Sequence, residues 1–261
     1  MERYNKIQSL RTYVRYLAAA KSRWRVHSPF LYELIEEVIR NKSHDHKLDA
    51  LLRWQEQLKG NSDWLAWKEL GAGKRVNKKR INRFYRQTVR PFSQYRILNG
   101  LVRFTNARNV LELGTGLGLS TLALAAGNDH AQVYSIEGNK SLYEFLRIHT
   151  SSYHKKNIEF LHGRIGSTLA LELPKIGKLD FVFLDGNHSY HPSMRYYDLL
   201  RPYLHESSLL VLDDIHWSQG MEWAWEELSA RPEVGFSVDL FHFGLLFFRQ
   251  DLEKRHFILR Y

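Results

Sequence analysis

The chain has 261 residues, enough for one large domain or for a domain of about 150 residues with an appendage. Hydrophobic residues make up 44% of the chain and aromatic residues 13%, which supplies a sizeable core and excludes disorder for most of the length. Because the sequence has no cysteine, disulfides, thiol nucleophiles and thiolate metal sites are excluded.

The net charge of +10 is distributed unevenly. Up to Asn109 there are 24 Lys and Arg against 9 Asp and Glu, and from Val110 onward there are 14 against 19. The basic part predicts either contact with an anionic partner (nucleic acid, a membrane surface or an acidic substrate) or a solvated basic face. No apolar run approaches the roughly 18 residues of a membrane span, and basic residues interrupt the apolar positions of Met1–Lys21. A cytoplasmic protein without a signal peptide is therefore expected.

The first third of the chain has helical periodicity. Ser28 is a suitable N-cap and Pro29 suits a first helical turn. A polar loop is expected over residues 41–47, and Gly71 with Gly73 predicts a further loop, whose closure over a binding site is left open. Helices are predicted around Ile7–Leu17, from Pro29, over Leu48–Leu58, and through Ile97 to Phe104.

Beyond Asn109 the pattern changes to strands that alternate with helices. This alternation predicts a parallel sheet covered by helices on both faces. Phe236–Phe241 and Leu245–Arg249 flank a short turn with a glycine and predict a terminal antiparallel hairpin. The expected fold is thus α/β with a doubly wound, mostly parallel, seven-stranded sheet over residues 109–261, preceded by a helical, basic extension or lid over residues 1–108. The other strands are predicted at 109–113, 132–136, 158–161, 179–184 and 208–212, with helices at 120–126, 141–149, 165–173 and 192–204.

The stretch Val110–Thr121 is the most informative part of the chain. A short apolar run contains Glu112 and opens into Gly114-x-Gly116-x-Gly118, which a helix-compatible segment follows at once. A strand, a tight turn and a helix N-terminus in this order are typical of the place where an α/β sheet binds a nucleotide-like ligand. Glycines permit the backbone angles of such a turn and let a ligand approach the main chain.

Acidic residues follow the ends of three further predicted strands. Glu137, about 20 residues after the glycine turn, is placed to accept hydrogen bonds from ribose hydroxyls. Asp185 and the pair Asp213–Asp214 are expected to converge with the turn, because ligands of open α/β sheets lie outside the carboxyl ends of the strands. Carboxylates so close together repel one another unless protons or a cation neutralise them, and their hard oxygen atoms suit Mg²⁺. Capping of the following helices is the alternative role for any single Asp.

Four ordered motifs in this region resemble those of the class I S-adenosylmethionine-dependent methyltransferases, which have a Rossmann-like fold. The resemblance covers about residues 110–249 and includes the terminal hairpin, which argues against the dinucleotide-binding dehydrogenases. The Asp-Gly-x-His-Ser-Tyr run and the Asp-Asp strand end are similar to the metal-dependent catechol-type and sugar-type O-methyltransferases. The four motifs are Val110–Gly118, Val133–Glu137, Leu179–Tyr190 and Leu209–Asp214.

This resemblance implies a site for the methyl donor and a site for a divalent metal. The glycines would line the methionine and ribose portion of S-adenosylmethionine, with Glu112 beneath them and Glu137 on the ribose. Metal ligands would be Asp185, Asp213 and Asp214, with Mg²⁺ as the expected ion. The implied cofactor-binding residues are Glu112, Gly114, Thr115, Gly116, Gly118, Ser120, Glu137, Gly163 and Asp185.

His188 lies three residues after Asp185, where the catechol-type enzymes have a lysine as general base. Histidine can take this role at neutral pH because its ordinary pKa is near 6.5, so His188 and Asp185 are the predicted catalytic residues. A hydrogen-bonding role beside the metal is the alternative for His188, and His216 is a second candidate base. Many relatives carry Gly-Asp after the third strand, next to adenine, but this chain has Gly163-Arg164, so no firm adenine contact is predicted.

The predicted activity is methylation of a hydroxyl group on a small molecule by S-adenosylmethionine, assisted by the metal. The alternative is a methyltransferase of RNA or another nucleic acid, with the basic segment Lys74–Arg90 and its aromatic residues as a binding arm. A non-catalytic binding protein of the same fold is the third hypothesis. The lack of an Asn/Asp-Pro-Pro-Tyr motif counts against methylation of nitrogen, and homodimer formation is left open. Trp217, Trp223 and Trp225 are candidate wall residues, although the last two cannot share one face of a helix.

Overall fold

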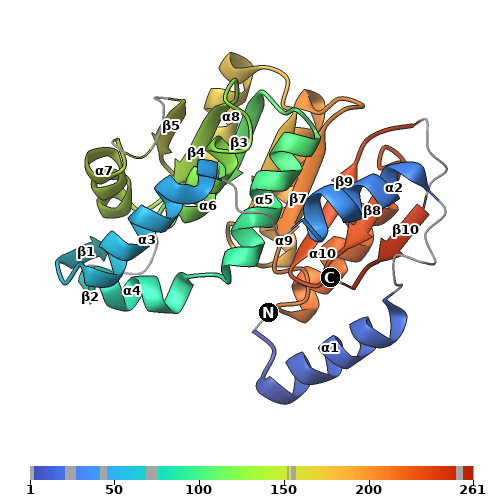
Figure 1. Ribbon diagram of the computed structural model, residues 1–261, viewed down its shortest axis with the longest axis horizontal. Helices are drawn as coiled ribbons and strands as arrows, with labels where there is room; N and C mark the ends of the chain where they lie inside the picture. Colours follow the sequence, from blue (N-terminus) through green and yellow to red (C-terminus); the bar gives the residue numbers. More distant parts are fainter. Residues whose placement is uncertain are drawn as a thin grey trace. The chain divides into compact units, whose positions relative to one another are not determined.

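The computed structural model describes residues 3–20, 28–41, 46–68, 76–151, 153, 157–250 and 255–260 (Figure 1). The chain forms two compact units, the first from Met1–Asn41 with Leu169–Tyr261 and the second from Lys42–Thr168. The N-terminal helices contribute to both units, and the predicted domain division after residue 108 stays a prediction. Among the described residues, no helix is long and apolar enough to cross a membrane.

The second unit contains three parallel strands in the order β3-β4-β5. Their predicted positions are confirmed, because β3 spans Asn109–Leu113, β4 spans Gln132–Glu137 and β5 spans Ile158–His162. The strands β3 and β4 are mostly buried, as continuous apolar runs in a covered parallel sheet should be. The helices α6 (Leu119–Ala125) and α7 (Lys140–His149) follow β3 and β4, and α5 (Phe92–Phe104) packs against α6.

A two-stranded antiparallel sheet in the second unit was not predicted. It consists of β1 (Trp64–Lys68) and β2 (Val76–Arg80), preceded by α3 (Asp49–Gly60) and followed by α4 (Ile81–Thr88). The sequence of β2 is mostly charged, and it lacks the apolar alternation by which a half-buried strand is recognised. The predicted loop with Gly71 and Gly73 lies outside the described residues, as does most of the polar segment 41–47. Of that segment, Asn41 lies outside any helix or strand, whereas His46 and Lys47 begin a 3₁₀ turn, His46–Leu48, rather than a loop.

The first unit contains five strands in the order β6-β7-β9-β8-β10. The strands β6 (Phe181–Leu184) and β7 (Leu209–Asp213) are parallel and fully buried. The predicted terminal hairpin is confirmed: β9 (Phe243–Phe247) runs antiparallel to both β7 and β8 (Phe236–Asp239). These strands are coloured orange to red in Figure 1.

Among the described residues, the mostly parallel sheet has eight strands rather than the predicted seven. The additional strand is β10 (Arg255–Ile258), which pairs parallel to β8 at the edge of the sheet. Only Phe257 of its four residues is buried. A short edge strand with so little apolar pattern has no clear signal in the sequence.

Helices of the first unit come from both ends of the chain. The helices α9 (Tyr190–Leu200) and α10 (Gln219–Ala230) pack against each other, and α8 (Ile165–Ile176) crosses the boundary between the units. A 3₁₀ turn at Arg201–Tyr203 follows α9 and brings the helical segment to within one residue of its predicted end at residue 204. No helix was predicted at the position of α10.

The predicted N-cap of the second helix is confirmed. The helix α2 spans Pro29–Leu34 and continues as a π-helical turn over Ile35–Ile39, and the Ser28 hydroxyl accepts a hydrogen bond from the Leu31 N–H. The first helix, α1 (Lys6–Ala19), begins with a capping box between Asn5 and Gln8. Its apolar residues at helical spacing, Ile7, Leu10 and Val14, are exposed, and α1 instead buries Thr12 and Tyr16.

Candidate active site

The glycine turn connects β3 to α6 with backbone angles that favour glycine. Gly114, Gly116 and Gly118 have φ values of 100°, 56° and 75°, in the left-handed region. At Gly118, the residue that caps α6, a Cβ atom would also come within 2.8 Å of the Leu146 side chain. The left-handed backbone favours glycine at this position, and a Cβ atom would also require the end of the Leu146 side chain to shift.

Glu137 lies at the carboxyl end of β4, directly against this turn. Its Oε2 accepts a hydrogen bond from the Gly116 N–H at 2.9 Å, and its Oε1 accepts one from the Asn139 N–H at 2.7 Å. Burial raises the pKa of Glu137, and the hydrogen bonds from these backbone N–H groups act in the opposite direction. Each carboxylate oxygen keeps a further lone pair, which a ribose hydroxyl can use. Gly163 is next to this residue, because its N–H donates to the Glu137 carbonyl oxygen.

Glu112 is fully buried beneath the same turn. Its Oε2 accepts hydrogen bonds from the hydroxyls of Thr121 and Ser135, and the Ser135 hydroxyl also pairs with Thr115 at 2.6 Å. Burial raises the pKa of Glu112 to about 7, although its hydrogen bonds oppose this shift. Among the described residues its Oε1 has no hydrogen-bond partner, so a buried polar atom is left for a ligand or a proton.

No role was predicted for Thr121 or Ser135. Both could have been identified from the sequence, because a buried carboxylate such as Glu112 needs hydrogen-bond donors. Thr121 and Ser135 carry hydroxyl groups in the helix and the strand that follow Glu112 along the chain. Ser120, another predicted site residue, is buried in the first turn of α6. The structure thus brings together, within the second unit, the predicted cofactor residues Glu112, Gly114, Thr115, Gly116, Gly118, Ser120, Glu137 and Gly163.

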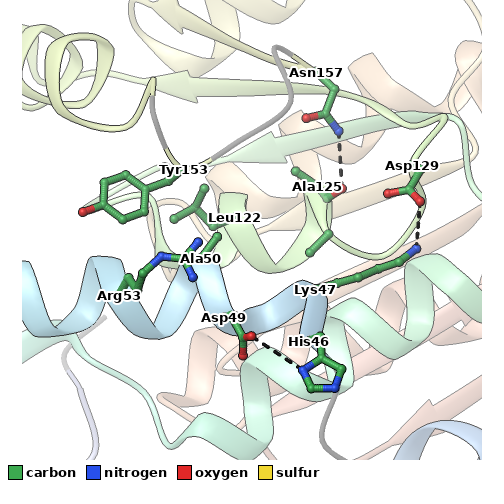
Figure 2. Close-up of a pocket in the computed structure, with 11 residues that line it drawn as sticks. His46, Lys47, Asp49, Ala50, Arg53, Leu122, Ala125, Asp129, Tyr153 and Asn157 are labelled. Carbon is green, nitrogen blue, oxygen red and sulfur yellow. Dashed lines mark hydrogen bonds and ion pairs between the residues drawn. The ribbon is translucent and has the colours of Figure 1, made fainter.

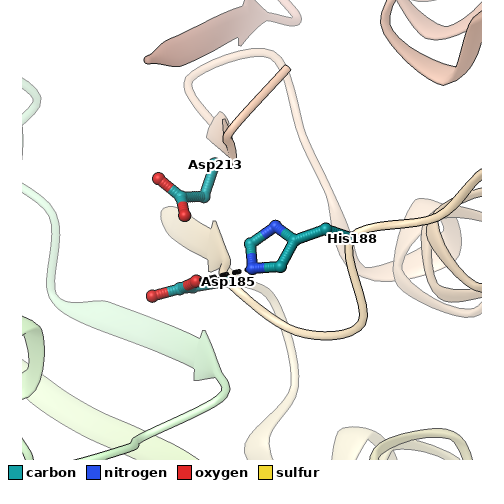
Figure 3. A group of neighbouring side chains, drawn as sticks. All are labelled: Asp185, His188 and Asp213. Atoms are coloured by element: carbon teal, nitrogen blue, oxygen red, sulfur yellow. Dashed lines mark ion pairs between the residues drawn. The ribbon is translucent and has the colours of Figure 1, made fainter. Parts of the chain in front are cut away.

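Asp185, His188 and Asp213 form a compact group in the first unit (Figure 3). Each side chain offers a ligand atom, and these atoms all lie within 4.8 Å of one another. Asp185 follows β6 and Asp213 ends β7, so the parallel pairing of these strands places both carboxylates at the same edge. The His188 Nε2 is 3.5 Å from the Asp185 Oδ1, and Asp213 is fully buried. We call these three residues the acidic group.

The third predicted metal ligand, Asp214, is not part of the acidic group. Its φ of 51° turns the chain after β7, and its N–H donates to the His242 carbonyl oxygen at 2.7 Å. A role for Asp214 in metal binding therefore stays a prediction. Two carboxylates and an imidazole are a suitable donor set for a divalent cation, and a cation would relieve the repulsion between the carboxylates.

His216, the second candidate base, has both ring nitrogens occupied. Its Nδ1 is 3.1 Å from Glu222 and its Nε2 is 2.9 Å from Asp239. Burial acts to lower the pKa of His216, but the hydrogen bonds and charges of these two carboxylates outweigh it and raise the pKa to about 9. A histidine that is protonated at neutral pH and donates from both nitrogens cannot accept a further proton. The geometry therefore favours His188 as the base.

Trp217 connects the acidic group to the N-terminal segment of the chain. Its ring centroid is 5.9 Å from that of His188, and the Arg3 guanidinium lies 3.7 Å from the Trp217 ring centroid on its face. The Tyr4 N–H donates to the Trp217 carbonyl oxygen. Trp223 is 45% exposed and Trp225 is 4% exposed, which confirms that these two do not share a helix face. The contribution of Arg3 and Tyr4 had no signal in the sequence, because they lie more than 200 residues from Trp217.

A separate cavity of about 280 Å³ lies in the second unit between α3 and the C-terminal end of α6 (Figure 2). Its rim includes residues that precede β4 and β5, at the edge of these strands opposite Glu137. Lys47 pairs with Asp129, the His46 ring is 3.7 Å from Asp49, and Arg53 also lines the cavity. The predicted site residues lie at the glycine turn and in the acidic group rather than in this cavity.

Comparison with known proteins identifies a methyltransferase-like region of the chain. Residues 111–215, which contain the glycine turn, Glu137 and the acidic group, match the family model of a methyltransferase domain. No curated protein sequence matches the chain. Residues 111–215 therefore carry the signature of a methyltransferase domain.

Solved structures of methyltransferases share the fold of this chain. A methyltransferase from Podospora anserina bound to S-adenosylhomocysteine shares 14% identity over 95% of this chain and 98% of that chain, with a TM-score of 0.60. An O-methyltransferase from Bacillus cereus in complex with S-adenosylhomocysteine shares 18% over 82% and 94%, with a TM-score of 0.56. The O-methyltransferase TomG from Streptomyces achromogenes, in complex with S-adenosylmethionine, shares 20% over 79% and 91%, with a TM-score of 0.52. The Rossmann-like methyltransferase fold that the sequence motifs predict is thereby confirmed.

Proposed function

We propose that this protein transfers the methyl group of S-adenosylmethionine to a hydroxyl oxygen of a small molecule, with the assistance of a divalent cation. The observation that carries this proposal is the acidic group, in which Asp185, His188 and Asp213 offer ligand atoms within 4.8 Å of one another. An enzyme that methylates oxygen must remove a proton from a weakly acidic hydroxyl, and this group has the residue types for that task. The O-methyltransferases among the structural neighbours support the same reaction class.

The residues of the second unit would hold the methyl donor. Glu137 accepts hydrogen bonds from the ribose hydroxyls with the lone pairs that the Gly116 and Asn139 N–H groups leave free. The glycines let the donor approach the main chain, and the N-terminus of α6 follows them directly. The orphan Oε1 of Glu112 beneath the turn is a further acceptor for a polar group of the donor or an ordered water.

His188 would act as the general base. It is only partly buried, so a substrate hydroxyl can reach its ring, and the proton of that hydroxyl passes to an imidazole nitrogen. The Asp185 carboxylate, 3.5 Å from Nε2, stabilises the imidazolium that results. The Trp217 ring beside His188 supplies a flat apolar wall, which suits an aromatic or other planar substrate.

Asp185 and Asp213 would hold the cation, with Asp214 as the further ligand, because His188 must keep a ring nitrogen free to act as the base. Bound there, a divalent ion would supply Lewis-acid chemistry, lowering the pKa of a coordinated hydroxyl and stabilising its negative charge. Asp213 is fully buried, and a divalent ion beside it would offset the desolvation of its carboxylate. Mg²⁺ is the ion we propose, since hard oxygen ligands dominate the set.

The experiment that tests this function measures the release of S-adenosylhomocysteine with a panel of hydroxylated acceptors, such as catechols, phenols and sugars. We expect turnover with at least one acceptor, its loss on addition of EDTA and its return with excess Mg²⁺. Turnover that survives complete removal of divalent ions would contradict the metal's role. Product carrying the methyl group on nitrogen or carbon, located by mass spectrometry, would contradict the reaction class, and binding of the donor without turnover on any acceptor would favour a non-catalytic binding protein.

A further inference from the structure

Residues 76–111 contain nine Lys and Arg and no Asp or Glu. The structure distributes the first part of this run over β2 and α4 in the second unit. The side chains of Lys78, Arg80, Arg83 and Arg86 are exposed there. Together with Trp64 on β1, we call them the basic ribbon.

The antiparallel pairing of β1 and β2 places an aromatic side chain among these cations. Trp64 is the register partner of Arg80, and Ala66 is the partner of Lys78, so Trp64, Arg80 and Lys78 share one face of the two strands. Leu65, on the opposite face, is buried. Trp64 is 62% exposed, and the Arg80 guanidinium lies 5.2 Å from its ring centroid. An exposed tryptophan flanked by cations is therefore built into the outward face.

The helix α4, which begins directly after β2, adds two further exposed cations. Ile81 and Tyr85 are buried, and α4 packs against α3, which leaves Arg83 and Arg86 in solvent. Among the described residues, none of the four cations of the basic ribbon forms an ion pair, whereas Lys59 and Lys140 in the same unit are each paired with a glutamate. Asp63, immediately before β1, is the one acid in residues 61–68. The basic ribbon thus keeps nearly its full positive charge.

The extent of the basic ribbon favours a chain of phosphates over a single phosphate group. At about 3.4 Å per residue in a strand, Lys78 and Arg80 are separated by about 7 Å. At about 1.5 Å per residue in a helix, Arg80 and Arg86 are separated by about 9 Å along α4. Cations distributed over such a length match a polyanion, and an exposed aromatic ring can stack on an unpaired base.

The basic ribbon is also tied to the cofactor residues of the same unit. The Ser141 hydroxyl donates to the Ala66 carbonyl oxygen of β1. Ser141 lies in the first turn of α7, whose N-cap Asn139 donates its N–H to Glu137. A ligand on β1 and β2 would therefore be anchored close to the residue assigned to the ribose of the methyl donor.

We infer that the basic ribbon binds single-stranded nucleic acid, with phosphates on Lys78, Arg80, Arg83 and Arg86 and a base stacked on Trp64. This inference concerns binding alone and is independent of the reaction proposed above. Duplexes bind more weakly, because their bases are already stacked and cannot reach the tryptophan ring. An anionic membrane surface would use the cations but would have no need of the aromatic ring at their centre.

Fluorescence anisotropy with a labelled oligouridine tests this inference at several salt concentrations. For four phosphate contacts, the logarithm of the affinity should fall against the logarithm of salt concentration with a slope of about −3. The double variant Lys78→Gln/Arg80→Gln should reduce the magnitude of this slope by about 1.4. Its matched control, Lys175→Gln/Lys178→Gln, removes two exposed cations of the first unit, of which Lys175 is paired with Glu172, and should leave the slope unchanged.

Trp64 separates stacking from charge. Trp64→Ala should weaken oligouridine binding on the order of tenfold without changing the salt slope, and Trp64→Phe should retain most of the affinity. Equal losses in the ribbon variant and its control, or an unchanged affinity of Trp64→Ala, would overturn the inference. Binding to phosphatidylserine vesicles that competes fully with oligouridine and is unaffected by Trp64→Ala would assign the surface to membranes instead. The release of S-adenosylhomocysteine with small acceptors is measured separately, so failure of either proposal is recognised independently.

Discussion

The Nε2 of His216 lies 2.9 Å from the Oδ2 of Asp239, and the Nδ1 of the same ring lies 3.1 Å from Glu222. Glu222 in turn accepts a hydrogen bond from Tyr4, which precedes α1, and forms an ion pair with Arg15 of α1. His216 therefore joins the end of the sheet to the N-terminal segment as a charged bridge rather than as a catalytic group.

This bridge predicts a specific dependence of stability on pH. Because the pKa of His216 is raised from 6.5 to about 9, the folded state keeps a proton that the unfolded state loses. The contribution is complete below pH 6.5 and is lost as the pH rises to about 9. It amounts to at most about 3 kcal/mol of unfolding free energy. Urea unfolding measured at several pH values should show that the unfolding free energy of the wild type falls between about pH 6.5 and 9, whereas that of His216→Gln changes less. The same dependence on pH in both proteins would contradict the bridge.

The two histidines near the acidic group should differ in their kinetic roles. His188→Gln is expected to lower kcat on the order of 10²- to 10⁴-fold, since it removes the proposed base. The affinity for S-adenosylhomocysteine should not change, because His188 lies outside the cofactor residues. His216→Gln is the matched comparison and should keep the pH dependence of kcat that His188→Gln loses. A normal pH profile in His188→Gln would assign the base elsewhere.

Binding of a cation can be followed apart from turnover. Mn²⁺, which electron paramagnetic resonance detects, should bind the wild type and should bind Asp213→Asn at least tenfold more weakly, because one charged ligand is lost. Asp198→Asn is the control, since Asp198 is an exposed acid on α9 and lies outside the acidic group. Equal Mn²⁺ affinity in both variants would show that the acidic group is not the metal site.

The glycine turn can be tested with a pair of glycines that have the same conformation. Gly118 and Gly177 have φ values of 75° and 79°, but only at Gly118 would a Cβ atom come within 2.8 Å of Leu146. Gly177→Ala should cost about 1–2 kcal/mol of unfolding free energy for the left-handed backbone alone. Gly118→Ala should cost more and should also weaken binding of S-adenosylhomocysteine. A Gly118→Ala protein as stable as Gly177→Ala would mean that the turn tolerates the added methyl group.

The central strands could be predicted from sequence because each is a short apolar run between turn signals. β3 agrees with its predicted range, β4 extends one residue beyond its range, and β7 is shifted from its range by one residue at each end. β10 and the pair β1–β2 were not predicted, because they are edge or exposed strands, whose residues need no alternating apolar pattern. On α1 the helix itself was predicted, but its apolar residues Ile7, Leu10 and Val14 are exposed. Helical spacing shows which residues share a face of a helix, but it does not show whether another part of the protein covers that face.

Candidate site residues could be predicted from the sequence where their position depends only on the end of a single strand. Glu137 and Asp213 lie at the carboxyl ends of their strands, and Asp185 lies directly after its strand, as the sequence indicated. The position of Asp214 outside the acidic group was not predictable, because it depends on a single positive φ. The partners of His216 and Trp217 were not predictable either, because Tyr4, Arg3 and Asp239 reach them through tertiary packing alone.

Calorimetric titration with S-adenosylhomocysteine tests the central claim, a methyl-donor site at the glycine turn, most directly. The wild type should bind one equivalent, and Glu137→Ala should bind at least tenfold more weakly, because the ribose hydroxyls lose their acceptor. The control Glu159→Ala, which removes an exposed acid on the neighbouring strand β5, should bind as the wild type does. Absence of binding to the wild type, or equal affinity in Glu137→Ala and the wild type, would contradict the account.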